Sequence, residues 1–257
     1  MLAWAGTLRN VRPLLEQTLA SAGTTGYNRS RYLMARPAHS PTELERYYDA
    51  RFAGHHSYRQ SVWRVLIDDY FSRWTANAES VLDLGCGFGE FINQVKAPRR
   101  FAIDLNPASR ALLAEEVELS SQDCSEPWPL KANCLDLVFT SNFFEHLPSK
   151  EALLATLREA NRCLRPGGRI IAMGPNIRYL PGAYWDFFDH YVPLTERSLA
   201  EALEAEGFKS ETVIGRFLPY SMSQGSQPPL WMLRAYLRLP QAWPFFGKQF
   251  LVVAVKT

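Results

Sequence analysis

One stretch, residues 81–91, constrains more than any other what this chain can fold into. Its sequence is Val-Leu-Asp-Leu-Gly-Cys-Gly-Phe-Gly-Glu-Phe. The apolar run Val81–Leu84 predicts a buried strand, and glycines then stand at positions 85, 87 and 89 before helical sequence resumes at Phe91–Val95. Glycine lets the backbone turn sharply and lets a ligand approach without meeting a Cβ atom. The stretch therefore predicts a strand, a tight turn and a helix start, an arrangement that serves either ligand binding or packing alone.

The spacing of these glycines differs from that of dinucleotide-binding proteins. The pattern is Gly-x-Gly-x-Gly with Asp83 two residues before the first glycine, whereas dinucleotide binders carry Gly-x-Gly-x-x-Gly. The run resembles motif I of the class I S-adenosylmethionine (SAM) methyltransferases. The resemblance implies SAM as the cofactor, and it assigns cofactor-binding roles to Asp83, Gly85, Cys86, Gly87 and Gly89.

Composition limits the classes of protein and partner. The chain has 257 residues, of which 47% are hydrophobic and 21% charged, so it can bury a full core. A net charge of +2 is too small to indicate a nucleic-acid partner. Its four cysteines form no Cys-x-x-Cys pair and no histidine stands at zinc spacing, so we expect reduced thiols, a cytosolic protein and no metal. No apolar run approaches the roughly 20 residues that a membrane span needs.

The first 75 residues are expected to form a helical cap region before the SAM-binding core of residues 76–257. The run Ser40-Pro41-Thr42-Glu43 is a capping box that predicts a helix from Pro41 to about Phe52. Apolar residues at helical spacing predict a second helix over Tyr58–Trp74. The link Gly54–Tyr58 is either an ordinary loop or, as the resemblance implies, a segment that folds over the cofactor.

Acidic residues follow the second and third expected strands, Arg100–Asp104 and Val117–Gln122. In a doubly wound sheet, an acid at the end of the second strand accepts the ribose hydroxyls, which favours Asp104, with Leu105 beside it, over a mere helix cap. The next helix should begin at Pro107, with Asn106 as N-cap. By resemblance, Asp123 accepts a hydrogen bond from the adenine amino group and the Cys124 amide contacts the ring. A simple turn acid is the alternative for Asp123.

The fourth expected strand, Leu135–Thr140, leads into a second match to the family. The run Asn142–Leu147 contains Glu-His-Leu, and the resemblance places Asn142 beside the methionine moiety and His146 at the edge of the acceptor site. His146 could equally cap the following helix. The connection Gly174–Leu194 is rich in aromatic residues and includes Asp189 and His190, which favours an acceptor pocket over core packing.

The remaining pattern completes an α/β fold. Helices are expected over Ser149–Leu164 and Thr195–Glu206, with Gly207 as C-cap, and strands over Arg169–Met173, Thr212–Leu218 and Gln249–Val255. The resemblance, which spans about residues 60–219, implies a Rossmann-like doubly wound sheet of seven strands, the last antiparallel. A helical insertion at about 220–247 precedes that strand. Its residues 228–246 could contact a membrane peripherally, form a homodimer, cover the substrate or simply pack.

The implied reaction is methyl transfer from SAM to a hydroxyl, in preference to nitrogen or carbon, of a small molecule such as a sugar or a lipid-linked glycan. His146 or His190 would be the base, and Asp189 would assist His190. A protein methyltransferase, a lipid or quinone methyltransferase and a non-catalytic SAM-binding protein stay open as alternatives.

Overall fold

In the computed structural model, which describes residues 56–220 and 227–257, the chain forms a seven-stranded sheet of order β3-β2-β1-β4-β5-β7-β6. The strands are β1 (Ser80–Leu84), β2 (Arg99–Asp104), β3 (Val117–Ser121), β4 (Leu135–Ser141), β5 (Leu164–Pro175), β6 (Phe208–Ile214) and β7 (Gln249–Lys256). All neighbouring pairs are parallel except those of β7, which runs antiparallel to both β5 and β6. The predicted doubly wound sheet with an antiparallel last strand is confirmed.

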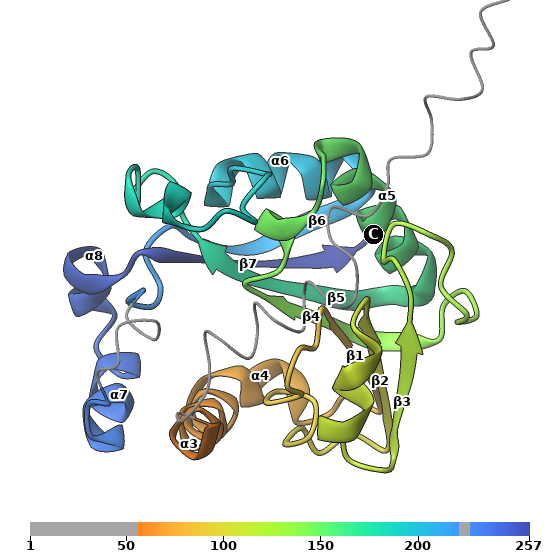
Figure 1. Cartoon of the computed structure of the whole chain (residues 1–257), viewed down its shortest axis with the longest axis horizontal. Helices are drawn as coiled ribbons and strands as arrows, with labels where there is room; N and C mark the ends of the chain where they lie inside the picture. Colours follow the sequence, from red (N-terminus) through yellow and green to blue (C-terminus); the bar gives the residue numbers. More distant parts are fainter. Residues whose placement is uncertain (1–55, 221–226) are drawn as a thin grey trace, which may run out of the picture. The chain divides into compact units, whose positions relative to one another are not determined.

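Helices cover both faces of the sheet. Helices α5 and α6 lie on one face, and α3 and α4 on the other (Figure 1). Within residues 56–220 and 227–257, the α-helices are α3 (His56–Leu66), α4 (Ser72–Thr75), α5 (Lys150–Cys163), α6 (Glu196–Ala205), α7 (Leu230–Leu237) and α8 (Trp243–Phe246). A π-helical segment, η2 (Ile67–Phe71), joins α3 to α4, and the 3-10 segments are η3 (Pro107–Leu112), η4 (Phe144–His146), η5 (Ala183–Asp186) and η6 (Pro240–Ala242).

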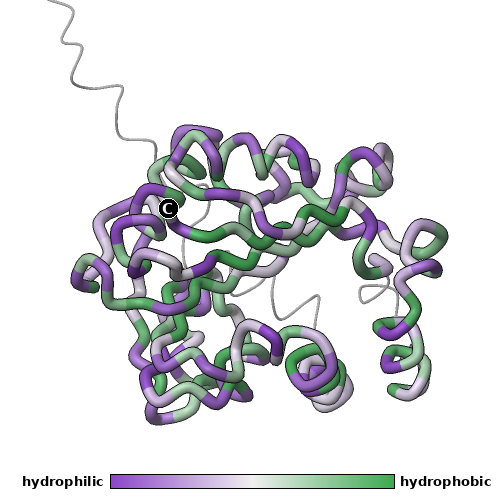
Figure 2. Tube along the Cα trace, turned by 180° about the vertical axis from the view of Figure 1, so that it is seen from behind, coloured by the Kyte–Doolittle hydropathy of each residue, from purple (hydrophilic) through white to green (hydrophobic). Residues whose placement is uncertain are grey.

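Strand β1 lies between β2 and β4, and every one of its residues is buried. Because side chains alternate across a strand, Val81 packs in the core with α3, while Leu82 and Leu84 pack in the core with α5 and α6. Figure 2 shows the same pattern as hydrophobic strands between more polar helices and loops. The apolar run of β1 therefore fixes the centre of the sheet, and the glycine turn follows directly at its carboxyl end.

Three expected elements differ around this turn. Phe91–Val95 forms isolated turns in place of the expected helix: the Val95 amide donates to the Phe91 carbonyl at 3.2 Å, while the Ile92 amide donates to Asp83. The helix after Asn106 is the 3-10 segment η3, although Asn106 caps it as expected by accepting from the Ala108 amide. The described part of the expected link, residues 56–58, already belongs to α3.

Two strands have other bounds than expected. Strand β5 begins at Leu164, before the expected turn, because Leu164 already pairs with Leu135, and the extra residues 165–168 of β5 bulge out before Arg169 pairs with Leu137. Strand β6 begins at Phe208, directly after Gly207, and ends at Ile214. Beyond it, Phe217 and Leu218 leave the strand and turn into the core, so their apolar character reflects burial in a loop.

The expected insertion before the last strand contains α7, η6 and α8. Arg234 of α7 forms an ion pair with Asp69, which anchors α7 to η2. The expectation that residues 228–246 contact a membrane or a second copy stays a prediction, as does the division of the chain at residue 75. The helix expected at 41–52 lies outside the described residues. Within the described part of the chain, no helix is both long and apolar enough to cross a membrane.

Candidate functional site

The glycine turn is tied to the end of β2 by backbone hydrogen bonds. The Gly85 amide donates to the Ile103 carbonyl at 2.8 Å, and the Gly87 amide donates to Asp104 Oδ2 at 2.8 Å. The other carboxylate oxygen, Asp104 Oδ1, accepts from the Asn106 amide at 2.8 Å. Since β1 and β2 are parallel, their carboxyl ends meet at one edge of the sheet, and Asp104 fixes the shape of the turn there.

The structure gives a second reason why glycine is required at positions 85 and 89. Gly85, Gly87 and Gly89 all have positive φ, at 70°, 50° and 70°. A Cβ atom at Gly85 would lie 2.2 Å from Cδ2 of Phe143, and one at Gly89 would lie 2.5 Å from Cδ2 of Leu113. Neighbouring side chains therefore occupy the positions that a Cβ atom would take at Gly85 and at Gly89. Glycine is needed at both positions for packing as well as for conformation.

Replacing Gly85 with Ala is expected to lower the free energy of unfolding by about 2–5 kcal/mol. The left-handed conformation costs an L-residue about 1–2 kcal/mol, and forcing Phe143 aside adds about 1–3 kcal/mol. Urea denaturation measures the sum. The matched control is Gly182→Ala, where nothing lies within 4 Å of the new Cβ and φ is −92°; a change of less than about 0.5 kcal/mol is expected. Equal effects of both substitutions would contradict the packing role of Gly85.

Three carboxylates gather beneath the turn. Asp83 is buried in β1, and burial raises its pKa well above its usual range, with Glu90 and Asp104 adding repulsion. Burial also raises the pKa of Asp104, although the amides of Asn106 and Gly87 oppose the shift. Arg59 of α3 forms an ion pair with Glu90 at 2.9 Å. Such a concentration of buried acids favours a ligand that carries positive charge.

The Asp83→Asn variant is expected to lose less stability than the wild type as the pH rises. A carboxyl whose folded pKa is raised stabilises the fold fully below its unfolded value of 3.8, and that stability is lost as the pH rises through the folded pKa. The Asp83→Asn variant has no charge to bury and keeps an acceptor for the Ile92 amide. Melting temperatures measured without ligand from pH 4 upward should therefore increasingly favour the variant. A constant difference between the two proteins would contradict this.

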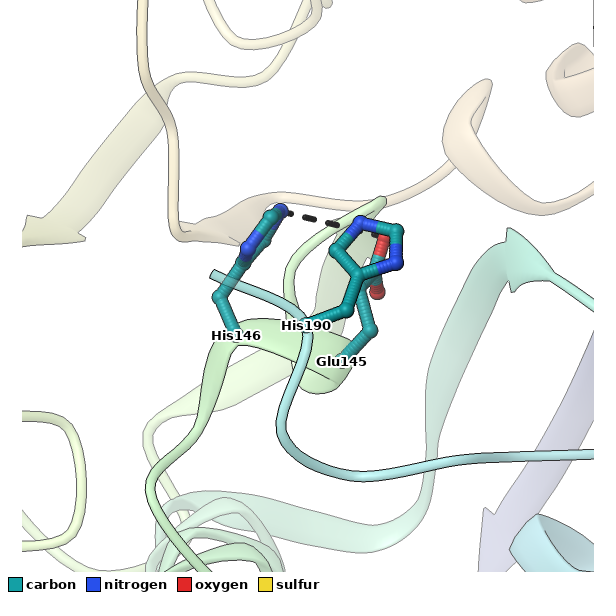
Figure 3. A group of neighbouring side chains, drawn as sticks. All are labelled: Glu145, His146 and His190. Carbon is teal, nitrogen blue, oxygen red and sulfur yellow. Dashed lines mark ion pairs between the residues drawn. The ribbon is translucent and has the colours of Figure 1, made fainter. Parts of the chain in front are cut away.

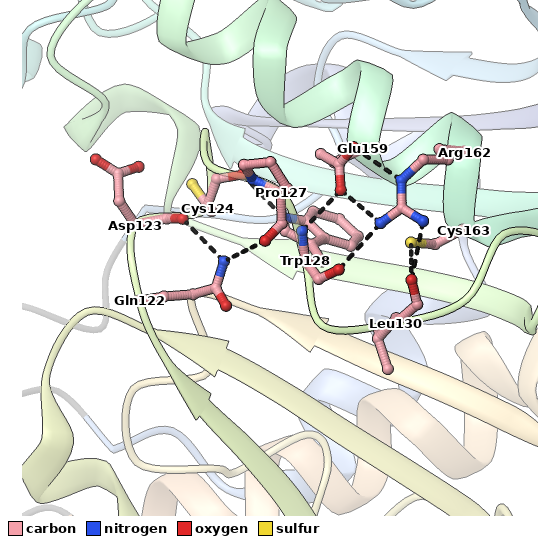
Figure 4. Close-up of polar contacts among 9 residues, drawn as sticks. All are labelled: Gln122, Asp123, Cys124, Pro127, Trp128, Leu130, Glu159, Arg162 and Cys163. Carbon is pink, nitrogen blue, oxygen red and sulfur yellow. Dashed lines mark hydrogen bonds and ion pairs between the residues drawn. The ribbon is translucent and has the colours of Figure 1, made fainter.

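The predicted adenine-binding pair, Asp123 and Cys124, lies in a loop that α5 holds in place. Asp123 Oδ1 accepts from the Ser125 amide at 2.8 Å. In Figure 4 the Asp123 carboxylate points away from the hydrogen bonds drawn around Gln122 and Trp128. The Cys124 carbonyl accepts from buried Trp128 Nε1 at 2.8 Å, and Glu159 of α5 accepts from the Trp128 amide at 2.7 Å. Burial raises the pKa of the Cys124 thiol to about 12, so it is a neutral packing group.

Asn142 stands at the end of β4, where the chain bends sharply. Its φ of 49° is rare for a residue other than glycine. Its amide donates to the Met173 carbonyl of β5 at 2.8 Å, and its side-chain Nδ2 donates to Ser141 Oγ at 3.0 Å. Strained backbone conformations cluster at functional sites, which agrees with a binding role here. Since β4 is parallel to β1, Asn142 lies at the same sheet edge as the glycine turn.

Beyond Asn142, segment η4 and the loop after β5 bring two histidines and two acids together. His146 Nδ1 lies 2.9 Å from the Asp189 carbonyl oxygen and 3.2 Å from Asp189 Oδ2. His146 Nε2 lies 4.0 Å from Glu145 Oε1, and the rings of His146 and His190 meet edge to face with centroids 4.9 Å apart. Figure 3 shows Glu145, His146 and His190 pointing toward one another. The sequence suggested Asp189 as a partner of His190, and the structure places its carboxylate against His146.

The pKa values of Glu145 and His146 are both raised in this cluster. Burial raises the pKa of Glu145 to about 7, with the His146 charge opposing the rise. Burial acts to lower the pKa of His146, but the hydrogen bond to Asp189 and the charge of Glu145 outweigh it, so the net pKa lies above its usual value. Groups that exchange protons near neutral pH suit acid–base chemistry.

The structure thus brings the sequence-predicted residues into two groups at one sheet edge. Asp83, the three glycines, Cys86, Asp104 and half-buried Leu105 surround the turn, and Asn142 leads to the cluster of His146, Asp189 and His190. Sequence reasoning missed Glu145, Glu90 and Phe143. Glu145 could have been found from its position next to His146 at a strand end. The contacts of Glu90 with Arg59 and of Phe143 with Gly85 join distant segments and leave no local signal.

Comparison with known proteins identifies the family. A family model described as a methyltransferase domain matches residues 55–213. Comparison with curated protein sequences gave no significant match.

Solved structures share the fold at low identity. A SAM-dependent methyltransferase of Archaeoglobus fulgidus is 18% identical, with a TM-score of 0.60, covering 83% of this chain and 99% of that one. One from Thermotoga maritima is 15% identical, with a TM-score of 0.59 and coverage of 84% and 97%. A Haloferax volcanii putative methyltransferase, solved with the activator Trm112, is 18% identical, with a TM-score of 0.56 and coverage of 81% and 96%. Because the family model covers more than half of the chain, the protein belongs to the methyltransferase domain family, and it has the fold of SAM-dependent methyltransferases.

Proposed function

We propose that this methyltransferase transfers the methyl group of SAM to a hydroxyl of a small molecule, of the sugar or lipid-linked glycan class. The observation that carries the proposal is the cluster of Glu145, His146, Asp189 and His190 at the end of β4. A hydroxyl is weakly acidic, so its methylation gains from a group that removes its proton, whereas the sulfonium donor is already activated. His146 and His190 are the candidate bases in this cluster.

Binding of SAM follows from the acids beside the glycine turn. SAM carries a sulfonium and an ammonium group, and the buried carboxylates of Asp83, Glu90 and Asp104 would stabilise this positive charge. Asp104 would also accept the ribose hydroxyls, because each carboxylate offers about four lone-pair sites and the two backbone amides use only two. Asp123 and the Cys124 amide would contact adenine, and Asn142 would lie beside the methionine moiety.

The loop around His190 supports a small-molecule acceptor. Trp185, Phe188 and Tyr191 are exposed there, although buried Asp189 and His190 lie among them in the sequence. Aromatic side chains commonly line ligand sites, with a few polar groups that orient the ligand. We infer that these rings contact the acceptor while the cluster engages its hydroxyl.

Product analysis tests the proposal. The protein is incubated with SAM labelled in its methyl group and with acceptors of three classes: sugars and lipid-linked glycans, quinols, and proteins. We expect label on a hydroxyl oxygen of the first class. Label on a nitrogen or carbon atom, label on quinols or proteins alone, or SAM binding without turnover of any acceptor would contradict the proposal.

A further inference from the structure

Glu145, His146 and His190 form a compact group of metal-ligating side chains. One carboxylate oxygen and one nitrogen from each imidazole lie within 4.8 Å of one another (Figure 3). Glu145 and His146 come from η4, whereas His190 comes from the loop after β5. The sequence pattern shows no sign of this group, because no short spacing joins all its members. Only the fold places them together.

The orientation of His146 is that of a prepared metal ligand. Its Nδ1 faces both the carbonyl and the carboxylate of Asp189, at 2.9 and 3.2 Å, so the ring proton is held on that nitrogen. In the neutral ring Nε2 then carries the lone pair, and it faces Glu145 Oε1 at 4.0 Å. Histidines that bind metals usually donate the other ring nitrogen to a carboxylate or carbonyl in this way, because it fixes the tautomer and the ring plane.

Burial makes a cation favourable at this position. Glu145 is 3% exposed and His190 is 6% exposed, while the His146 side chain is 24% exposed. Among the described residues, the ion-pair partner recorded for Glu145 is His146. A buried carboxylate needs compensating charge or coordination. His146 is thus the most exposed member of the group.

We propose that Glu145, His146 and His190 bind one divalent transition-metal ion, with water or the acceptor hydroxyl completing its coordination. Two imidazoles and a carboxylate suit Zn²⁺ or a similar ion better than Mg²⁺, which prefers oxygen ligands. Ligand atoms of a tetrahedral site with bonds of ~2.1 Å lie roughly 3.4 Å apart. Because the ligand atoms lie within 4.8 Å of one another, no separation has to shorten by more than about 1.4 Å.

The ion would take part in the proposed methyl transfer, and this role, unlike the binding itself, rests on the proposed function. A metal-bound hydroxyl loses its proton more readily, as metal-bound water does. The proton leaves to water. The oxygen then bonds to the methyl carbon as the carbon–sulfur bond breaks, giving a methyl ether and neutral S-adenosylhomocysteine. With the ion bound, both imidazoles are ligands and neither is the base; without it, one of them is the candidate base.

Titration of chelator-treated full-length protein with Co²⁺ tests the site, with visible absorption as the readout. We expect one Co²⁺ per chain and bands typical of a mixed nitrogen and oxygen site. Glu145→Gln, His146→Ala and His190→Ala should each weaken binding by at least about a hundredfold. Asp189→Asn, which loses only the carboxylate behind His146, should weaken it by about 10–100-fold. Circular dichroism establishes that each variant is folded.

Asp186→Asn is the matched control, because Asp186 is an exposed acid in the same loop and should leave Co²⁺ affinity unchanged. Absence of stoichiometric Co²⁺ binding, or unchanged affinity in folded His190→Ala, would overturn the metal site. SAM binding measured on the same chelated samples separates this result from the proposed function. Retained SAM binding without Co²⁺ binding rejects the ion alone, whereas loss of SAM binding in the wild type rejects the methyltransferase proposal.

Discussion

Asp104→Ala is expected to weaken SAM binding by at least about a hundredfold while the chain stays folded. A hydrogen bond to a charged acceptor contributes about 1.5–3 kcal/mol, so losing the contacts to two ribose hydroxyls corresponds to about 10²–10⁴ in affinity. Substitution also removes the acceptor for the Gly87 and Asn106 amides, which loosens the turn. Calorimetric titration with SAM gives the affinity.

The fold should tolerate this change because two effects oppose each other. The two backbone hydrogen bonds are lost, but the buried charge of Asp104 and its repulsion of Asp83 are lost as well. Glu118→Ala is the control, since it removes an exposed acid from neighbouring β3 and should leave SAM affinity unchanged. Normal SAM affinity in folded Asp104→Ala would refute the ribose assignment.

His146→Gln and His190→Gln are expected to lower kcat by about 10²–10⁴ with little change in SAM affinity. Removal of a group that assists proton transfer costs this much, and removal of a ligand that activates the hydroxyl would also act on kcat. The rate is measured at saturating SAM and acceptor, with Asp186→Asn as the control that keeps both imidazoles. If both glutamine variants keep the wild-type kcat, the cluster has no chemical role and positioning of donor and acceptor alone accounts for the rate.

The parts of the fold that could be predicted from the sequence are those that depend on interactions between residues close together in the chain. Ser149 and Thr195 cap α5 and α6 by accepting hydrogen bonds from amides three residues on, and Gly207 follows α6 with φ of 85°. The apolar run of β1 and the position of Asp104 at the end of β2 are likewise predictable, because strand length and the parallel fold fix them.

Tertiary contacts decide the rest. Phe217 and Leu218 suggest a strand but are buried in a loop, since a buried loop selects the same residue types. The glycine pattern at 85 and 89 does not reveal that a Cβ atom there would collide with Phe143 or Leu113, because both contacts join distant segments. The partners of Glu145 include residues from a loop that follows a different strand. Periodicity carries no information about contacts of this kind.

A crystal structure of the full-length protein with S-adenosylhomocysteine, the product of methyl transfer, tests the account most directly. The ribose hydroxyls should lie within hydrogen-bond distance of Asp104, adenine should lie beside Asp123, and the sulfur should point toward Asn142 and the cluster of His146 and His190. A ligand bound away from the glycine turn, or one with its sulfur directed away from that cluster, would contradict the account.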